Sequence, residues 1–556
     1  MKKRLAAGIL ASVMALSLAE CGGGAGSAPA APAPEEAATA AEGEAAPAEG
    51  TAAAPEATAT TPGGNPISVA SKELGGDTVV FANNEVFSTT DDFNNFTMSN
   101  KIFMHTWGDS LVEMDYDTGE YRNALAESIE WSEDYLTAHV KIREGVLFSD
   151  GDEVKGEDVA FSYQRVADGE GLANTMSWKQ TLAGAEATGD YTADIFFKKP
   201  MPNFDCEACA LLIISKDAYE ADPENFWNAP VGSGPYKWVS TDFVNNTGKL
   251  EFWNEDWWGF EAYGKEPGNV KYIVYENIDE DSTRVSSLRT NEIQIAGNLP
   301  YADVDTVLGD GLQVLKNDQN DDVFLCINVN NTPALQDVRI RKAMSMAIDR
   351  QAIVDAIVGN GVAATFPVPE KSIGYQEGHS YEYDPEGAAA LLAEAGYDGT
   401  ELDIEIASGN IPKGDEVAQA VLSYLQSAGF NAKITQMESA AFSDARFSGN
   451  YQIQLCSFSM VNGESWKIMD EIVGRIDFFK MGIDREEAWQ YFDQAMVEMD
   501  INKRDELMQQ GYALVMEDYD PIYLYDRICA IGVASNLEGL VLNTDQTLEM
   551  RFMSLK

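Results

Sequence analysis

The chain changes character abruptly near residue 76, and this break constrains its fold more than any other feature. Residues 22–71 consist mostly of Ala, Pro, Glu, Gly and Thr and contain no aromatic residue. Such a segment cannot bury enough apolar surface to offset the entropy of ordering it, so we expect a disordered tether. From Asp77 onward, apolar strands alternate with amphipathic helices to the end of the chain. The sequence therefore predicts a mixed α/β body on a flexible tether.

The first residues are typical of an export signal. Three basic residues at positions 2–4 precede an apolar run over 5–19, which is shorter than the about 20 residues needed to span a bilayer. The run ends in Leu-Ala-Glu-Cys, which resembles a bacterial lipobox with Cys21 as the lipid-modified residue. Glu20 departs from that pattern, because a small residue normally precedes the cysteine. We predict a signal peptide over 1–20 and a lipid anchor on Cys21; a secreted protein cut nearby is the alternative.

The charge of the chain excludes some classes of partner. With 38 Lys and Arg against 91 Asp and Glu, the formal net charge is −53. Nucleic acids and anionic membrane surfaces are bound through cationic side chains, and this chain would repel both. We therefore expect no nucleic-acid partner.

No catalytic or metal-binding motif is present. The chain lacks the Gly-x-Ser-x-Gly, Walker, His-Glu-x-x-His and Gly-x-Gly-x-x-Gly patterns, and its three histidines are not at ligand spacing. Cys206 and Cys209 form a Cys-x-x-Cys pair without further zinc ligands, so a local disulfide or two buried thiols is expected. The acidic run 317–322 is interpreted as solvated surface charge rather than a calcium loop. We predict no catalytic residue, no metal and no cofactor.

Hydrophobic periodicity and capping residues place the main elements of the body. A helix is expected over about 155–165, another after Asp337, and a third from Asp384-Pro385 to its stop at Gly396. The expected strands are 78–82, 138–143, 271–275, 323–329, 402–406, 451–458 and 521–525. No second linker or repeat interrupts them, which indicates two or more lobes that exchange strands.

Four ordered blocks resemble the family 5 extracellular solute-binding proteins, the oligopeptide- and dipeptide-binding lipoproteins of bacterial ABC importers. The first block runs from Ser132 to Arg165 and contains Arg-Glu-Gly-Val-Leu-Phe-Ser-Asp-Gly. The others are Gly-Ser-Gly-Pro-Tyr at 232–236, Asp-Val-Arg-Ile-Arg-Lys-Ala with Ala-Ile-Asp-Arg within 337–350, and Tyr-Asp-Pro through Ala-Gly-Tyr within 383–397.

The resemblance implies a two-lobe, periplasmic-binding-protein-like clamp with an extra inserted domain and a chain that crosses between the lobes at a hinge. Its expected parts are a signal peptide 1–20, a tether 21–75, lobe I from 76–111, 231–323 and 521–556, an inserted domain 112–230 and lobe II 324–520.

The function implied by the resemblance is peptide capture between the lobes and delivery to ABC permease subunits. We expect a monomer, lipid-anchored at the outer face of a bacterial cytoplasmic membrane. The alternatives are a non-peptide ligand such as an oligosaccharide or a metal chelate in the same clamp, and an exported enzyme, adhesin or sensor on this scaffold.

Peptide-binding members hold the peptide's amino group with an Asp that follows an aromatic residue at the end of one strand. The resemblance places Phe458 at the aromatic position and Val461 at the Asp. Either Glu464 substitutes for that carboxylate, or the ligand lacks the amine. The full set of residues expected to contact ligand is Met98, Asn100, Trp178, Arg446, Phe458, Asn462, Trp466 and Tyr525.

Several of these residues have a structural alternative. Arg446 either binds a ligand carboxylate or forms a surface ion pair, and Trp178 either stacks on the ligand or packs in a core. Tyr523 and Tyr525 alternate with Leu524 as in a half-buried strand, so one is expected to reach the ligand and the other to pack.

Overall fold

The computed structural model describes residues 76–91, 93, 102–115, 118–169, 176–370, 372–407, 410–459, 465–466, 468–473, 479–543 and 547–556. All of these residues belong to one unit, 68–556. The predicted signal peptide, the tether and Cys21 lie outside the described residues. No helix in the described ranges combines the length and apolar character needed to cross a membrane.

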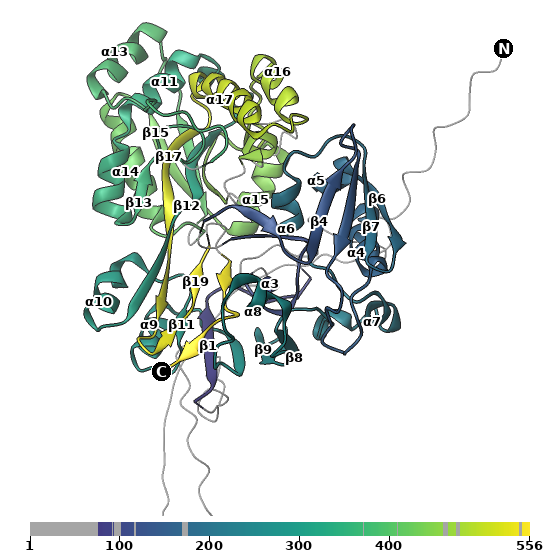
Figure 1. The fold of residues 1–556 in the computed structure, drawn as a ribbon. Coiled ribbons are helices and arrows are strands. Elements are labelled where there is room, and N and C mark those ends of the chain that lie inside the picture. The colour runs from purple at the N-terminus through teal and green to yellow at the C-terminus, as the bar shows by residue number, and fades with distance from the viewer. Residues whose placement is uncertain are drawn as a thin grey trace, which may run out of the picture. The chain divides into compact units, whose positions relative to one another are not determined.

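One sheet of eleven strands forms the centre of this unit (Figure 1). Its order is β15-β14-β16-β12-β17-β11-β1-β10-β9-β8, with β13 paired to β17. The strands are β1 Thr78–Asn83, β8 Tyr236–Asp242, β9 Thr247–Phe252, β10 Tyr272–Asn277, β11 Ile295–Ala296, β12 Gln313–Ile327, β13 Gly361–Ala363, β14 Leu402–Ala407, β15 Ala432–Met437, β16 Ile453–Ser459 and β17 Ile522–Val533. We call β8, β9, β10, β1 and β11 the first half of the sheet, and β16, β14 and β15 the second half.

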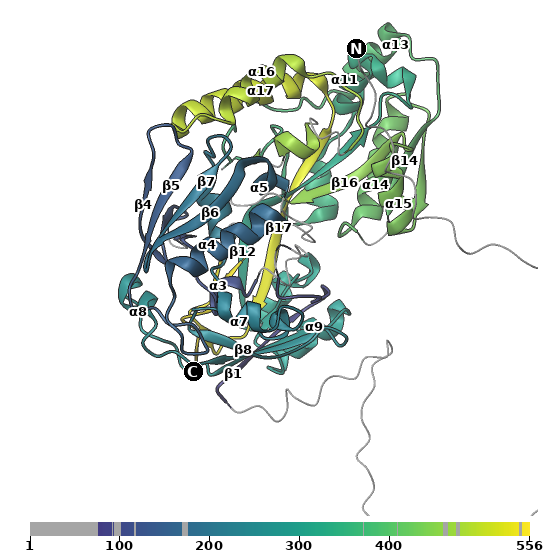
Figure 2. The same ribbon diagram turned by 90° about the vertical axis from the view of Figure 1, so that its right-hand side faces the viewer.

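The long strands β12 and β17 join the two halves as an antiparallel ribbon. Residues 313–317 of β12 pair with the end of β17 that also contacts β11, whereas residues 321–327 lie beside β16. The register shifts between these two portions, from Asn317 to Asp321, and again between Val323 and Phe324. Both ribbon views show β17 running from one group of strands to the other (Figures 1 and 2).

Alternating side chains build a separate core on each face of the sheet. On β1, Val79 and Phe81 enter one hydrophobic cluster, and Val80 and Ala82 enter another. Side chains on a strand point alternately to opposite faces, so a strand that is apolar throughout is buried on both sides. The predicted strand 78–82 is confirmed in this form.

A second sheet of four strands has its own core. Its order is β4-β5-β7-β6, with β4 Ala126–Trp131, β5 Thr137–Ile142, β6 Leu182–Gly189 and β7 Thr192–Phe197. The helix α4, Gly156–Asp168, packs on this sheet and buries Val159 and Tyr163 against Val140 and Ile195. The predicted strand 138–143 and the predicted helix over about 155–165 are thereby confirmed.

Three residues that the sequence predicts to begin or end helices do so in the structure. Asp337 accepts a hydrogen bond from the Arg339 amide at the start of α11, Val338–Ala347. Asp384 accepts one from the Gly387 amide at the start of α13, Pro385–Ala395. Gly396 ends α13 with a φ of 74°, in the left-handed region that favours glycine.

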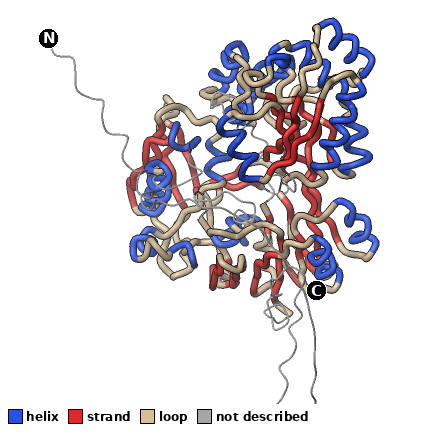
Figure 3. Tube along the Cα trace, turned by 180° about the vertical axis from the view of Figure 1, so that it is seen from behind, coloured by secondary structure: helices blue, strands red, loops and turns tan. Residues whose placement is uncertain are grey.

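The remaining α-helices are distributed along the described chain, and Figure 3 distinguishes them from the strands that they flank. They are α3 Met104–Trp107, α5 Met176–Thr181, α6 Phe204–Cys209, α7 Lys216–Ala221, α8 Trp258–Tyr263, α9 Asp281–Arg289, α10 Val304–Gly309, α12 Arg350–Ile353, α14 Gly414–Ser427, α15 Ser439–Ser448, α16 Glu486–Ala495 and α17 Ile501–Asp518. The described residues also form three short antiparallel pairs of strands. These are β2 Val112–Met114 with β3 Tyr121–Asn123, β18 Leu537–Glu538 with β21 Ser554–Leu555, and β19 Val541–Leu542 with β20 Leu548–Glu549.

The Gly-Ser-Gly-Pro-Tyr block has a packing role. A Cβ atom on Gly232 would lie 2.4 Å from the Trp107 carbonyl oxygen, and the Gly234 amide donates to that same oxygen at 3.1 Å. Backbone approaches this close leave no room for a side chain. The block therefore fixes the chain against α3.

Candidate ligand-binding site

Two of the residues that the sequence predicts to contact ligand lie close together, one at the end of β16 and one in the last turn of α15. Phe458 is half-buried, and its ring centre lies 6.4 Å from that of Phe479. Arg446, in the last turn of α15, places its guanidinium carbon 5.2 Å from the centre of the Phe479 ring. A guanidinium at this distance from an aromatic ring is within range of a cation–π contact. Phe479 therefore brings Arg446 and Phe458 together, although no sequence pattern marks Phe479 itself.

The hydrophobic cluster against which Phe458 packs is rich in aromatic side chains. Trp466 is 9% exposed and belongs to the same hydrophobic cluster as Phe479 and Tyr523. The Phe324 ring centre lies 5.6 Å from that of Phe479 and 5.7 Å from that of Tyr523. We use the name aromatic wall for the five aromatic residues of this cluster around Phe458. They are Phe324, Phe458, Trp466, Phe479 and Tyr523. Phe324, Phe479 and Tyr523 are at most 2% exposed, so the exposed part of the wall is formed by Phe458 and the edge of Trp466.

Three other predicted contact residues cannot be placed. Met98, Asn100 and Asn462 lie outside the described residues, as do Val461 and Glu464. Their roles stay predictions.

The expected alternation of Tyr523 and Tyr525 is wrong. All five residues from Ile522 to Asp526 are buried, and Tyr525 belongs to the cluster on the opposite face from Tyr523. The cause is the register shift at this point, where Val323 pairs with Tyr525 but Phe324 pairs with Tyr523, so that Leu524 is an extra residue. Tyr523, rather than Tyr525, therefore lies on the aromatic wall.

Trp178 lies in the core of the four-stranded sheet. It is 1% exposed, and its ring packs edge-to-face on Tyr163 with 5.7 Å between ring centres. This is the packing alternative that the sequence left open for Trp178. Its contact with a ligand stays a prediction that would require this core to open.

A buried pair of acidic residues lies beside the aromatic wall. Asp322 and Asp526 are opposite each other on β12 and β17, and they are 2% and 8% exposed. Burial raises the pKa of Asp526 to about 6, and its hydrogen bond with Asp322 acts in the opposite direction. The acidic run 317–322 lies within β12, Gln313–Ile327, rather than in a loop, and the prediction that it is solvated is wrong for its last residue, Asp322.

The cysteines and acidic residues offer little for a metal. Cys206 and Cys209 are buried thiols on α6, and the Cys209 sulfur lies 3.7 Å from Nε2 of His105. The Cys326 sulfur lies 3.1 Å from the hydroxyl oxygen of Tyr451. Among the described residues, no group of three or more His, Cys, Asp or Glu side chains is arranged to hold a metal ion.

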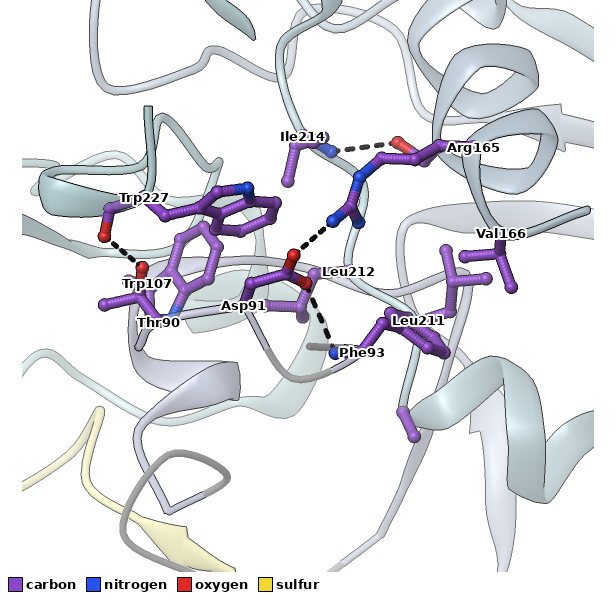
Figure 4. A pocket seen from close by; sticks show the side chains of 12 residues that line it. Thr90, Asp91, Phe93, Trp107, Arg165, Val166, Leu211, Leu212, Ile214 and Trp227 are labelled. Carbon is purple, nitrogen blue, oxygen red and sulfur yellow. Dashed lines mark hydrogen bonds and ion pairs between the residues drawn. The ribbon is translucent and has the colours of Figure 1, made fainter. Parts of the chain in front are cut away.

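A small cavity beside α4 is too small for a ligand (Figure 4). Its volume of about 20 Å³ has room for a single water molecule. An ion pair between Asp91 and Arg165 crosses it, and Arg165 also lies 4.8 Å from the Trp227 ring centre. Burial raises the pKa of Asp91 against the opposing charge of Arg165. The cavity is a packing defect around a structural ion pair.

Comparison with known families identifies the class of this chain. Residues 120–475 match the model of the bacterial extracellular solute-binding proteins, family 5 middle region. The glutathione-binding protein GsiB of Escherichia coli K12 is 29% identical over 382 residues, which cover 66% of this chain and 71% of GsiB.

Solved structures share the fold. HbpA2 from Haemophilus parasuis superposes with a TM-score of 0.75 at 23% identity, over 86% of this chain and 100% of that one. The dipeptide-binding protein from Pseudoalteromonas sp. SM9913 in complex with Met-Leu gives 0.73 at 19% identity, with the same coverage. NikA from Staphylococcus aureus in complex with Ni(L-His)2 gives 0.70 at 17% identity, again over 86% and 100%. The α/β fold is thus that of a two-lobe binding-protein clamp with an inserted domain.

Proposed function

The chain belongs to the bacterial extracellular solute-binding proteins of family 5, and on this basis we propose that it captures peptides between two lobes and delivers them to the permease of an ABC importer. The observation that carries the proposal is the β12–β17 ribbon, which joins two halves of one sheet beside the aromatic wall. A ligand that contacts both halves stabilises the closed arrangement by its higher affinity for it. The irregular register of the ribbon makes it the natural hinge.

The proposed lobes follow the ribbon. Lobe I comprises 76–111, 231–323 and 521–556, lobe II comprises 324–520, and the inserted domain comprises 112–230. The core of the four-stranded sheet supports treating the inserted domain as a separate packing unit.

The chemistry of the aromatic wall supports a peptide ligand. Phe458 and Trp466 provide surface for apolar side chains, and the Arg446 guanidinium suits a peptide carboxylate, which it can bind bidentately. Met98, Asn100 and Asn462 complete the proposed contacts. Two similar proteins, a glutathione-binding protein and a dipeptide-binding protein, carry peptide ligands in their names.

We place the protein at the outer face of the cytoplasmic membrane, anchored through lipid on Cys21. The basic start, the apolar run and the tether support this location. Replacing Cys21 with Ser should move the protein from the membrane fraction to the soluble exported fraction. An unchanged distribution would contradict the anchor.

A non-peptide ligand is the second candidate function. It is favoured by Val461, which stands where the resemblance places the peptide-anchoring carboxylate. An oligosaccharide would stack on the aromatic wall, and NikA shows that this fold can hold a metal–histidine complex.

Thermal denaturation of the full chain with a panel of ligands tests the function. A ligand at a hundred times its dissociation constant stabilises the folded form by about 2.7 kcal/mol. We expect peptides of two to five residues to raise the melting temperature, and maltotriose and Ni(L-His)2 not to do so. Stabilisation by either of the latter without any peptide response would overturn the peptide assignment while retaining the clamp.

A further inference from the structure

Two cysteines lie one turn apart on the buried face of α6. Cys206 and Cys209 are 6% and 3% exposed, whereas Asp205 of the same helix is exposed. Residues three apart on a helix are neighbours, with about 5–6 Å between their Cβ atoms. A disulfide needs about 3.5–4.5 Å between the Cβ atoms, so a small tightening of this turn brings the two sulfur atoms within bonding range.

The end of α6 is wound more tightly than an ideal α-helix. The Ala210 amide donates to the Glu207 carbonyl oxygen at 3.2 Å, and the Leu211 amide donates to the Ala208 carbonyl oxygen at 3.2 Å. Hydrogen bonds between residues three apart are those of a 3-10 turn, in which the side chains at i and i+3 lie directly above one another. A disulfide within the preceding turn would extend this geometry by one residue.

The imidazole of His105 contacts the more deeply buried thiol. Nε2 of His105, on α3, lies 3.7 Å from the sulfur of Cys209, and His105 is 6% exposed. An imidazole nitrogen at this position can accept the thiol proton, and the thiolate is the form that attacks a disulfide. The carboxylate of Glu113, on β2, lies near enough to His105 to favour the imidazolium that this transfer produces.

Two other buried cysteines are arranged differently. Cys326 on β12 and Cys456 on β16 are 0% and 2% exposed, and the register of these strands offsets them by two residues. Diagonal neighbours of this kind are about 7–8 Å apart, which exceeds the range of about 4.4–6.8 Å between Cα atoms that a disulfide spans. The sulfur of Cys326 contacts the Tyr451 hydroxyl group at 3.1 Å, which is a poor base. This pair therefore serves as an internal comparison.

We propose that Cys206 and Cys209 form a reversible dithiol–disulfide site in which His105 is the base for Cys209. The family to which the chain belongs is extracellular, and disulfides form and persist outside the cytoplasm. The site requires no ligand in the clamp, so it is independent of peptide capture. Its reaction partner is a small disulfide or dithiol, which is why oxidised glutathione and dithiothreitol are suitable probes.

Oxidation by oxidised glutathione proceeds in two exchanges. The thiolate of Cys206, the more exposed of the two, attacks one sulfur of the oxidant, and one glutathione thiolate leaves. The thiolate of Cys209, whose proton has passed to Nε2 of His105, then attacks the Cys206 sulfur and displaces the second glutathione thiolate. The two leaving thiolates take up the two protons. Two cysteine thiols thus become one disulfide, and one oxidised glutathione becomes two reduced ones.

Access to Cys206 requires α6 to open locally. The helix has six residues, and the side chain of its N-cap residue, Asn203, accepts no capping hydrogen bond from the described residues. Short helices without such a cap open at a low free-energy cost. Oxidation should therefore proceed in the folded chain, without global unfolding.

Peptide mapping of the folded full chain measures the reaction. Cys206 and Cys209 lie in one tryptic peptide, 199–216, so their disulfide lowers its mass by two hydrogen atoms and protects both sulfurs from alkylation. We expect oxidised glutathione at pH 7 to form this disulfide and dithiothreitol to reverse it, while Cys326 and Cys456 remain thiols. In Cys209→Ser the glutathione adduct on Cys206 should accumulate, and in Cys206→Ser no adduct should form on Cys209.

His105→Gln tests the base, because glutamine can hydrogen-bond to Cys209 but does not accept its proton. The rate of disulfide formation should fall roughly tenfold or more at pH 7 and approach the wild-type rate at pH 9, where a thiol with a pKa of about 8.5 ionises unaided. His139→Gln is the matched control, since the His139 side chain is 51% exposed and pairs with Asp194 in the four-stranded sheet. Its rate should match the wild type at both pH values.

The charged groups around the site are carboxylates and guanidinium groups, whose ordinary pKa values lie outside the range of this profile. Glu113 on β2 interacts with His105, and Arg122 and Arg551 form ion pairs with Glu113. Burial acts against each of these charges, but the opposite charges and hydrogen bonds outweigh it, so the pKa of Glu113 is lowered and those of both arginines are raised. On α6 itself the acids are Asp205 and Glu207. The profile thus reports on the thiols and His105.

The possible failures are distinguishable. If the pair stays reduced in the folded chain at a glutathione concentration that oxidises it in urea, or if either cysteine joins another one, the site is overturned. If the disulfide forms but His105→Gln reacts at the wild-type rate at pH 7, or is equally slow at both pH values, the role of His105 is overturned. Should His105→Gln not fold, as circular dichroism would show, the wild-type profile decides. A rate maintained down to pH 7 supports the base, and a rate that falls about tenfold per pH unit below the ordinary thiol pKa contradicts it.

Discussion

Replacing Arg551 with Met should strongly destabilise the protein, because Arg551 neutralises two buried acids. Its side chain is 1% exposed and contacts Glu113 at 3.0 Å and Glu549 at 2.5 Å. The substitution keeps much of the apolar volume but leaves both carboxylates buried without this cation. Removing one partner of a buried ionic group costs about 3–5 kcal/mol. Glu113 retains a second contact with Arg122 at 2.8 Å, so we expect about 3 kcal/mol at pH 7.5.

The destabilisation should depend on pH with a defined sign. Burial acts to raise the pKa of Glu113, but the charges of Arg551 and His105 and the hydrogen bonds with Tyr263 and Arg122 together outweigh it and hold the pKa below its usual value. In the wild type this contribution is present above the unfolded pKa and is lost as the pH falls. In Arg551→Met the contribution of burial to Glu113 loses its largest opponent, so Glu113 favours protonation and stability is lost as the pH rises. The difference between the two proteins should therefore be larger at pH 7.5 than at pH 5.

Urea denaturation followed by tryptophan fluorescence measures this difference. Arg289→Met is the matched control, since Arg289 forms an exposed ion pair with Asp310, with side chains 47% and 39% exposed. Exposed pairs contribute about 0–1 kcal/mol, so the control should change little at either pH. A loss in Arg551→Met that is independent of pH, or no larger than that of the control, would refute the electrostatic reasoning.

Three further substitutions test the packing and the titration. Between about pH 4 and pH 6 the wild type should lose stability, because the unfolded chain releases a proton that Asp526 retains in the folded chain. The raised pKa of about 6 implies a loss of about 2–3 kcal/mol, measured by urea denaturation. Asp526→Asn should abolish this loss, and an unchanged pH slope would count against the reasoning. Gly232→Ala should lower stability by about 2 kcal/mol, because the new Cβ meets the Trp107 carbonyl oxygen at 2.4 Å; a wild-type melting temperature would disprove that contact. Trp178→Ala should cost about 3–5 kcal/mol in chemical denaturation through the cavity that it leaves, and a loss under 1 kcal/mol would argue for a surface position.

Local signals in the sequence predicted the elements whose ends are fixed by short-range chemistry. The caps at Asp337 and Asp384 and the stop at Gly396 depend on hydrogen bonds and backbone angles within a few residues, and each acts as predicted. The family resemblance likewise predicted the clamp, because its blocks are mostly packing motifs such as the one at Gly232.

Features set by distant contacts were not predictable in the same way. The predicted strand began at Val323, whereas β12 begins ten residues earlier because β17, about two hundred residues away in sequence, pairs with it. This pairing buries Asp322, and the same register shift moves Tyr525 to the other face. Arg446 and Phe458 were predicted as contacts, but their meeting point, Phe479, has no local signal.

Photo-crosslinking tests the central claim, peptide capture at the aromatic wall, most directly. A tetrapeptide with a photoreactive diazirine side chain is irradiated with the full chain, and the attached residues are mapped by mass spectrometry. We expect attachment within 453–466 and at 322–324 and 523–526 of the ribbon, and loss of attachment when unmodified peptide is in excess. A second pocket, on α16 and α17, is lined by Tyr491 and Leu514. Attachment confined to that pocket, or labelling that survives competition, would contradict the account.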